Sequence, residues 1–208
     1  MGRCRRESKR ITKGASIKIE STQKSPLVLG IDLGTSGVRI ALINMNYELV
    51  HFSSSEYSIG LQKCEDWKNI CSKLIKNIPS EKKERIIACS IDGTSGTLMC
   101  CDYSGSPLGD ALPYFSTCIN EQKAFLEKYR ISSNSSSFGR ASKLINKFGS
   151  NILLRHQADW ISGWLLNDWT FGEEGNNIKL GWNIVERAWP KEIEELSWFK
   201  ALPKILPS

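Results

Sequence analysis

The sequence predicts an α/β fold, and three observations indicate it. Residues 27–31 and 38–43 are apolar, β-prone runs on either side of a short turn, which is the pattern of a tight hairpin. Residues 65–78 then change to a helical period, with apolar side chains on one face. Residues 86–91 form another short apolar run, typical of a buried strand. Strands and a helix therefore alternate along the chain, as in α/β domains.

The turn of the hairpin, residues 32–37, is the first candidate site. It follows a nearly continuous apolar run, as expected for a strand that is buried on both faces. The turn contains Asp32, two glycines and two hydroxyl side chains. Exposed N–H groups and hydroxyls can hold phosphate oxygens, and a carboxylate can hold the water shell of Mg²⁺. The turn therefore suits a metal-bound polyphosphate. The alternative is an ordinary hairpin in which Asp and Gly only form the turn.

The elements after the hairpin follow in a regular order. Turn-forming asparagines lead into a predicted third strand at residues 47–52. The helix at 65–78 ends before Pro79, and a charged loop at 81–85 leads into the next strand. The residues predicted to form the buried face of this helix are Trp67, Ile70, Cys71, Leu74, Ile75 and Ile78.

The second candidate site follows the strand at 86–91. Asp92, Gly93 and Thr94 end this strand, and a further strand at 97–101 turns at residues 102–105. Ligands of open α/β sheets collect at the carboxyl ends of the strands, so we expect Asp32 and Asp92 to share this edge. Paired carboxylates there suit sugar hydroxyls and Mg²⁺. The alternative is that Asp92 and Gly93 merely begin a turn.

The second half of the chain contains two further predicted helices, at 119–129 and 142–148, and a solvated loop at 132–137. Tryptophans at 160 and 164 could stack on a sugar, but their spacing is that of one helix face, which favours core packing. Asp159 is predicted either to reach a substrate or to cap local backbone. His156 is predicted to be a partly buried structural histidine.

Composition excludes several classes of protein. No stretch approaches the roughly 18 uninterrupted apolar residues of a membrane span. The net charge of +6 comes entirely from residues 1–26, and the remainder is balanced, which argues against nucleic acid as a partner. The seven cysteines form no CxxC pair, and the two histidines lie far apart, so we expect reduced thiols and no zinc site. The basic segment 1–26 is either an organelle transit segment or a disordered tail.

A resemblance to known proteins begins at residues 32–36. Asp-Leu-Gly-Thr-Ser after an apolar strand resembles the first phosphate motif of the sugar-kinase, heat-shock and actin ATPase superfamily. That superfamily has a ribonuclease-H-like fold, which opens with three strands, a helix and a further strand. The order predicted from the residues agrees with this opening, and agreement between levels strengthens the fold prediction.

The segment 86–114 narrows the resemblance. It is similar to the N-terminal half of the FGGY carbohydrate kinases, and most similar to the plant and cyanobacterial pentulose kinases, either xylulokinase-like or D-ribulose kinases. Segments 155–165 and 176–182 resemble the same group. The resemblance covers residues 27–208 and disfavours a heat-shock-type or actin-type ATPase. It implies an N-terminal sugar-kinase domain. With the basic segment 1–26 as a possible transit segment, we expect a location in the chloroplast or the cytoplasm.

The resemblance implies ATP-dependent phosphorylation of a pentulose, D-ribulose or D-xylulose, with ATP and Mg²⁺ as cofactors. Asp32 would position Mg²⁺ through water, or a sugar hydroxyl. The residues that would hold phosphate are Gly34, Thr35 and Ser36. Gly37 would allow close approach of the backbone. The residues that would line the pentulose pocket are Asp92, Gly93 and Thr94.

Two departures from the family pattern qualify these expectations. Residues 115–118 replace a polar set that many relatives use for sugar contacts. Family members also continue beyond the point that corresponds to residue 208, and the missing part carries the general base and most of the adenine site. We therefore expect an incomplete domain with impaired activity, because both proton transfer and alignment of the reactants would be lost. Two interpretations remain, a pentulose kinase or a non-catalytic fragment that binds sugar or a partner.

Overall fold

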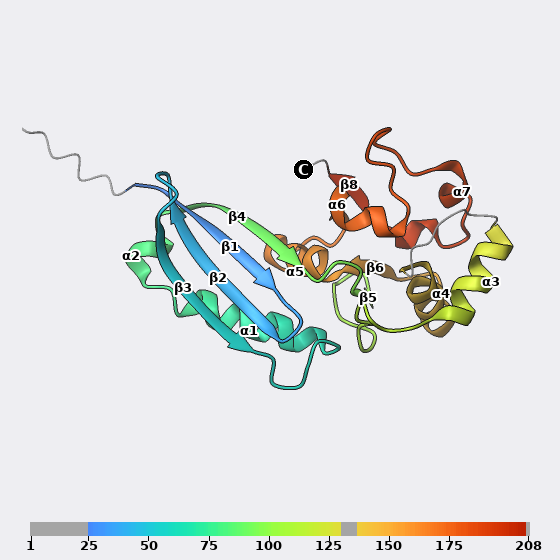
Figure 1. Cartoon of the computed structure of the whole chain (residues 1–208), viewed down its shortest axis with the longest axis horizontal. Coiled ribbons are helices and arrows are strands. Elements are labelled where there is room, and N and C mark those ends of the chain that lie inside the picture. Colours follow the sequence, from blue (N-terminus) through green and yellow to red (C-terminus); the bar gives the residue numbers. More distant parts are fainter. Residues whose placement is uncertain (1–24, 130–136, 207–208) are drawn as a thin grey trace, which may run out of the picture.

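The computed structural model describes residues 25–129 and 137–206. The molecule is elongated, with a four-stranded sheet at one end and shorter strands and helices at the other (Figure 1). The basic segment 1–24 lies outside the described residues, and so does most of the loop predicted at 132–137.

The sheet confirms the predicted α/β fold and its opening order. Its strands are β1 (Leu27–Leu33), β2 (Gly37–Asn44), β3 (Leu49–Glu56) and β4 (Ile86–Gly93), in the order β3-β2-β1-β4. The first three are antiparallel neighbours, and β4 runs parallel to β1. The crossover from β3 to β4 contains α1 (Cys64–Lys76) and the one-turn helix α2 (Ser80–Lys83). The predicted charged loop is therefore partly helical, because Pro79 starts a turn there.

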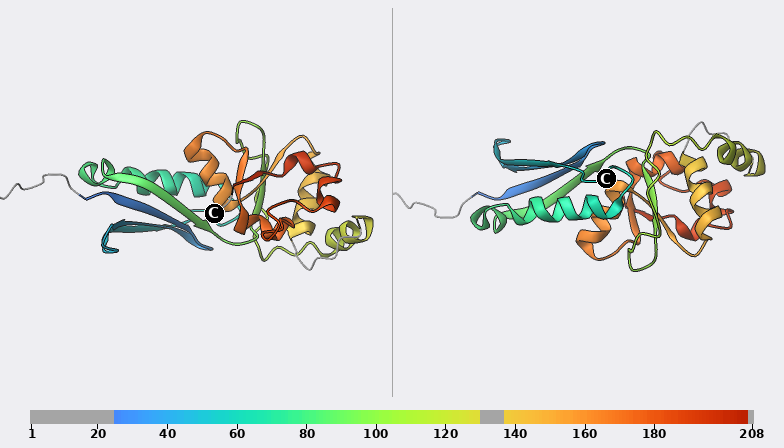
Figure 2. Two further views of the ribbon diagram at one scale, coloured as in Figure 1. Left: turned by 90° about the horizontal axis from the view of Figure 1, so that it is seen from above. Right: turned by 90° about the horizontal axis from the view of Figure 1, so that it is seen from below.

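One face of the sheet is buried and the other is open. Along β1, Leu29, Ile31 and Leu33 are buried, whereas the residues between them are partly or fully exposed. The buried residues pack with Trp67 of α1 in one hydrophobic cluster. Figure 2 shows α1 along this face, and no helix of the described chain lies along the opposite face. The prediction that the first strand is buried on both faces is therefore wrong.

The prediction that residues 86–91 form a buried strand is also wrong. β4 lies at the edge of the sheet, and among the described residues it pairs only with β1. Ile87 is 67% exposed, and Cys89 is exposed as well. The apolar run indicates a strand correctly, but burial depends on a neighbouring strand and a covering layer that the described chain does not place there.

The third strand begins later than predicted. Tyr47 adopts a left-handed conformation, with φ of 63°, and belongs to the turn. The side-chain carbonyl of Asn44 accepts hydrogen bonds from the N–H groups of Asn46 and Glu48. This local capping by Asn fixes the turn, so the ladder with β2 starts only at Leu49.

The second half of the molecule is built from short strands and helices around a second core. The remaining elements are β5 (Leu98–Cys101), α3 (Ile119–Tyr129), α4 (Ser137–Phe148), β6 (Leu153–His156), α5 (Gln157–Leu166), β7 (Phe171–Glu173), α6 (Glu174–Asn177), η1 (Ile178–Leu180), α7 (Lys191–Glu194), η2 (Phe199–Ala201) and β8 (Lys204–Leu206). β5 pairs antiparallel with β6, and β7 pairs parallel with β8. Helix α4 starts earlier than predicted, because Ser137 is buried and helical rather than part of a loop.

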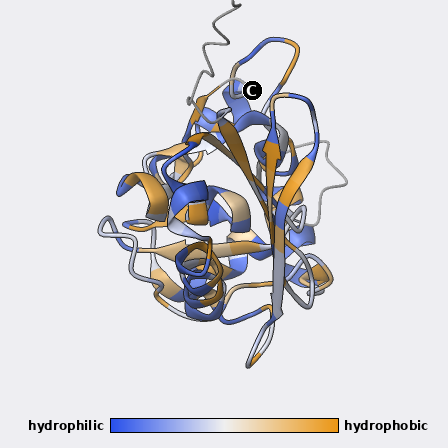
Figure 3. Ribbon diagram, turned by 90° about the vertical axis from the view of Figure 1, so that its left-hand side faces the viewer, coloured by the Kyte–Doolittle hydropathy of each residue, from blue (hydrophilic) through white to orange (hydrophobic). Residues whose placement is uncertain are grey.

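The two cores adjoin at the β5–β6 ribbon, where Met99, Cys101 and Leu153 belong to the first core and Leu98, Cys100 and Leu154 to the second. Trp160 of α5 is buried and lies edge-on to Trp67 of α1, with ring centroids 6.0 Å apart. In the second core the rings of Phe125 and Phe138 stack at 4.9 Å. Figure 3 shows hydrophobic stretches both in the strands and on the helices. Core packing of Trp160 was predicted and is confirmed. Within the described ranges, none of the helices has the length and apolar character needed to cross a membrane.

Replacing Gly37 by alanine is expected to lower the free energy of unfolding by roughly 1–3 kcal/mol. A Cβ at this position would overlap the main-chain carbonyl oxygen of Ser55 on β3, and backbone atoms there have little room to move. Gly30→Ala is the matched control in the same sheet, because its nearest atom, the Ala41 carbonyl oxygen, would lie 3.9 Å away. Urea unfolding of both variants tests this, and equal losses would contradict it.

Candidate functional site

Three charged side chains form a row across the end of the large sheet. Strand register places Asp32 of β1 beside Asp92 of β4 on one side and Arg39 of β2 on the other. All three residues are exposed. The neighbours of Asp32 in β1, Ile31 and Leu33, point into the core, so the Asp32 side chain projects from the open face of the sheet. The prediction that Asp32 and Asp92 share one edge of the sheet is confirmed.

Arg39 belongs to this row although it was not predicted from the sequence. Its Nη1 lies 2.9 Å from Oδ2 of Asp32, and both side chains are about half exposed. An exposed pair of this kind adds little stability, roughly 0–1 kcal/mol. Its value is chemical, because a guanidinium beside the turn can bind phosphate oxygens. The pairing of Arg39 with Asp32 could have been predicted from the sequence, because a hairpin that closes at residues 34–37 places residue 39 opposite residue 32.

In the turn at 34–37, the groups available to bind phosphate are the side-chain hydroxyls rather than the N–H of Gly34. The N–H of Gly34 donates to the carbonyl of Gly37 at 2.9 Å and so closes the hairpin. Thr35 and Ser36 are exposed, and their side chains have no hydrogen-bond partner within the described part of the chain. A phosphate at this turn would therefore meet Thr35 and Ser36 before the N–H of Gly34.

The end of β4 is tied to α5. A Cβ on Gly93 would lie 3.2 Å from the main-chain nitrogen of Ala158, so glycine lets the strand end pack against the start of this helix. Oδ1 of Asp92 accepts a hydrogen bond from the N–H of Gly93 at 2.8 Å. This is the local turn role that the sequence left open for Asp92. Its carboxylate stays exposed and keeps further lone pairs for a ligand.

A chain of hydrogen bonds connects the two candidate segments. Oε1 of Gln157 accepts from the N–H and the hydroxyl of Thr94, at 3.0 and 2.7 Å. Nε2 of Gln157 donates to the phenol oxygen of Tyr57 at 3.2 Å, and that phenol donates to the carbonyl of Gly34 at 3.1 Å. Burial holds the pKa of Tyr57 well above its usual value, so the phenol remains a donor. No spacing in the sequence indicated Tyr57 or Gln157, because the contacts span 23 to 100 residues.

The buried polar residues near α5 serve structure. Asp159 accepts hydrogen bonds from the N–H of Glu173 at 3.1 Å and from Nδ2 of Asn177 at 2.9 Å. These contacts tie α5 to the β7–α6 segment, 14 to 18 residues along the chain, so Asp159 does not cap its own local backbone. A contact of Asp159 with a substrate stays a prediction. Burial raises the pKa of Asp159 to about 6. His156 is buried with Nδ1 3.3 Å from the Thr97 carbonyl oxygen, and burial lowers its pKa to about 4, in agreement with a structural histidine.

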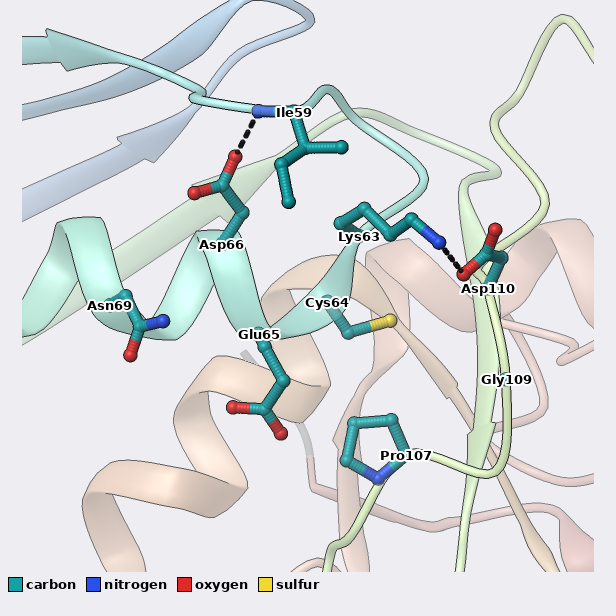
Figure 4. A pocket seen from close by; sticks show the side chains of 9 residues that line it. All are labelled: Ile59, Lys63, Cys64, Glu65, Asp66, Asn69, Pro107, Gly109 and Asp110. Atoms are coloured by element: carbon teal, nitrogen blue, oxygen red, sulfur yellow. Dashed lines mark hydrogen bonds and ion pairs between the residues drawn. The ribbon is translucent and has the colours of Figure 1, made fainter.

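A cavity of about 200 Å³ lies between the first turn of α1 and the 107–110 loop (Figure 4). An ion pair between Lys63 and Asp110, at 2.6 Å, and a hydrogen bond from the N–H of Ile59 to Asp66 close its rim. None of the predicted site residues lines it. Over residues 25–129 and 137–206, His, Cys, Asp and Glu side chains form no group of three that could hold a metal ion. The sheet-end row therefore remains the best-supported candidate site.

Comparison with solved structures shows the fold. Plasmodium falciparum glycerol kinase, solved with ADP, is 15% identical and superimposes with a TM-score of 0.67 over 87% of this chain and 43% of its own length. A xylulose kinase from Brucella ovis is 18% identical, with a TM-score of 0.73 over 86% of this chain and 42% of its own. A xylulose kinase from Rhodospirillum rubrum is 14% identical, with a TM-score of 0.69 over 85% and 42%. No protein-family model matches the chain.

The chain therefore has the mixed α/β, ribonuclease-H-like fold of sugar-kinase domains. It spans less than half the length of the kinases that it resembles. Identities of 14–18% carry the likeness no further than the fold.

Tyr57→Phe is expected to lower the free energy of unfolding by roughly 0.5–1.5 kcal/mol, because it removes the oxygen that joins Gly34 to Gln157. The backbone amide signals of Gly34 and Thr94 should both shift in NMR spectra. Tyr47→Phe is the control, since Tyr47 is 92% exposed and its hydroxyl has no hydrogen-bond partner in the described part of the chain. Equal effects of the two variants would contradict a linking role for Tyr57.

Substitution of His156 should change the pH dependence of stability. The folded-state pKa of His156, about 4, lies below its unfolded value of roughly 6.5, so its contribution is complete above pH 6.5 and is lost as the pH falls to 4. The loss amounts to about 3 kcal/mol. Asp159, with its pKa raised to about 6, acts oppositely and loses its contribution as the pH rises from about 4 to 6.

His156→Gln should therefore be destabilised less than the parent protein by acidification from pH 6.5 to 4, and Asp159→Asn should be destabilised more. Urea unfolding at several pH values measures both slopes. Parallel curves for the parent and the two variants would contradict the prediction.

Proposed function

We propose that this chain is the sugar-binding and phosphate-binding part of a carbohydrate kinase that phosphorylates a pentulose, D-ribulose or D-xylulose, with ATP and Mg²⁺. The observation that carries the proposal is the row of Asp92, Asp32 and Arg39 beside the hydroxyl-bearing turn. The row lies at the carboxyl end of the parallel pair of strands, where α/β sheets bind ligands. The shared fold of glycerol and xylulose kinases supports it.

The nucleotide end of the proposed site is the hairpin turn. Thr35 and Ser36 would donate hydrogen bonds to phosphate oxygens, and the Arg39 guanidinium would add a charge-assisted bond. A single exposed carboxylate fits a magnesium ion that keeps most of its waters, so Asp32 would hold Mg²⁺ through water. When bound, Mg²⁺ would neutralise charge on the phosphates. Gly34 and Gly37 would shape the turn.

The sugar end of the proposed site is the end of β4. The exposed Asp92 carboxylate would accept hydrogen bonds from pentulose hydroxyls, and Gly93 would line the pocket while it packs against the start of α5. The hydroxyl of Thr94 donates to Gln157 at 2.7 Å and also lies 2.6 Å from the Thr97 hydroxyl, so Thr94 would line the pocket mainly by positioning the strand end. Through Gln157 and Tyr57, a change at this end would reach the phosphate turn.

Catalytic turnover requires a general base, and none can be assigned in this sequence by a motif match. No residue corresponds to the general base of the resembled family, and loss of such a base lowers a rate by a factor of roughly 10²–10⁴. We therefore propose that residues 27–208 act as one domain whose own kinase activity is weak. We propose that the segment 1–26 is either a transit segment or a tail. The protein would accordingly be located in the chloroplast or the cytoplasm.

A second candidate is a non-catalytic module that binds a sugar or a partner protein. The outer edge of β4, which has no partner strand among the described residues, favours this alternative, and Ile87 on this strand is 67% exposed. Unpaired strand edges are templates for pairing with another chain. The two functions differ in turnover but share the sugar-binding residues.

The proposal is tested by ADP release from the purified chain with D-ribulose, D-xylulose and glycerol, together with calorimetric binding of the same sugars and of MgADP. We expect pentulose binding, weak ADP release, and at least about tenfold weaker pentulose binding in Asp92→Asn, because a hydrogen bond to a charged group is lost. Asp32→Asn should remove the remaining turnover. A folded chain that binds neither pentulose nor MgADP would contradict the proposal, and sugar binding without turnover would favour the non-catalytic module.

A further inference from the structure

A cavity of about 250 Å³ lies away from the candidate kinase site. It is found toward the end of the β5–β6 ribbon where Cys101 pairs with Leu153, whereas Thr94 and Gln157 lie toward the opposite end, where Leu98 pairs with His156. The residues that line the cavity include Arg155, Asp168, Trp169, Thr170, Lys200 and Lys204. None of them belongs to the proposed kinase site, so an inference here is independent of that proposal.

The lining of this cavity is cationic. Arg155, Lys200 and Lys204 carry three positive charges, and Asp168 carries the one negative charge, which leaves a net charge of +2. The Asp168 carboxylate already accepts a hydrogen bond from the N–H of Thr170 at 2.8 Å. Both lysines are exposed at the mouth of the cavity.

Arg155 gives the cavity a fixed, buried cation. It is 1% exposed, and it takes part in none of the ion pairs of the described chain. Its Nε donates to the carbonyl oxygen of Trp169 at 2.6 Å, and its Nη1 donates to that of Ala201 at 2.9 Å. Burial lowers the pKa of Arg155 to about 10, so the group stays charged at neutral pH.

The partners of Arg155 are main-chain carbonyls, which carry no net charge. They include Leu154 through Nη1 and, at 3.4 Å, Thr170 through Nη2. Four of the five N–H groups of a guanidinium are engaged in this way, and one N–H of Nη2 has no acceptor in the described part of the chain. The carboxylates of Asp159 and Asp168 act on Arg155 from a distance, but neither forms an ion pair with it in the described chain. An anion in the adjoining cavity would give the guanidinium a direct charge-assisted hydrogen bond.

We propose that this cavity is a binding site for a small phosphate-bearing molecule, such as a phosphate monoester. A phosphate dianion matches the net charge of +2, and it can accept hydrogen bonds from a guanidinium and from ammonium groups together. The fixed Arg155 would orient the phosphate, and Lys200 and Lys204 would close over it. The volume of about 250 Å³ suits a phosphate with a short organic body.

The test is a ¹⁵N NMR titration of the full chain with inorganic phosphate and with methyl phosphate, at ionic strength held constant with chloride. We expect saturable shifts of the Thr170, Lys200 and Lys204 amide signals. The double variant Lys200→Gln/Lys204→Gln should bind each probe at least about tenfold more weakly, because two charged hydrogen-bond donors are lost. It leaves the buried Arg155 and its hydrogen bonds in place, so folding should be retained.

Two control variants distinguish binding in this cavity from general attraction of anions to surface lysines and from binding at the hairpin turn. Lys73→Gln/Lys76→Gln also removes two positive charges, but from exposed positions on α1. It should change the dissociation constant of each phosphate probe less than twofold. Arg39→Gln should leave the shifts at Thr170, Lys200 and Lys204 unchanged. Equal weakening by both lysine pairs, shifts confined to residues 34–37, or no saturable shift at the cavity amides would each overturn the proposal.

Discussion

The structure depends on the packing of Trp67 between the large sheet and α5. Its indole is fully buried, its Nε1 donates to the Leu61 carbonyl oxygen at 2.9 Å, and its ring meets the edge of Trp160. Burial of such a side chain stabilises by several kcal/mol, of the order lost when Trp is cut to Ala. The contact fixes α5 against the sheet, and α5 in turn brings Gln157 to the end of β4.

The candidate site is a consequence of strand register. Because β1 pairs antiparallel with β2 and parallel with β4, three charged positions far apart in the sequence fall in one row. A slip of one residue would turn Asp32 toward the core and its buried neighbours toward water, so the apolar face holds the polar row in place. Stability of the sheet and geometry of the site therefore rest on the same alternation.

The sheet also shows where local reasoning fails. Apolar content predicted that residues 86–91 were buried, yet Ile87 is largely exposed. An apolar run shows that a strand could be buried. Whether the strand is buried depends on the neighbouring strands and helices that cover it. The same reason explains β1, where Val28 and Gly30 remain partly exposed because the helices of the described chain cover one face of the sheet and leave the other open. Exposed apolar positions on the edge strand are where an additional chain or segment would pair.

The sequence by itself determined the α/β class, the hairpin and its turn, the α1 helix, and the shared edge of Asp32 and Asp92. These follow from short-range periodicity and from the rule that parallel strands end together. The tertiary structure alone decided the link from Thr94 through Gln157 and Tyr57, and the cationic cavity around Arg155. Both join residues tens of positions apart, and side-chain contacts over such separations depend on how whole elements pack, which periodicity does not encode.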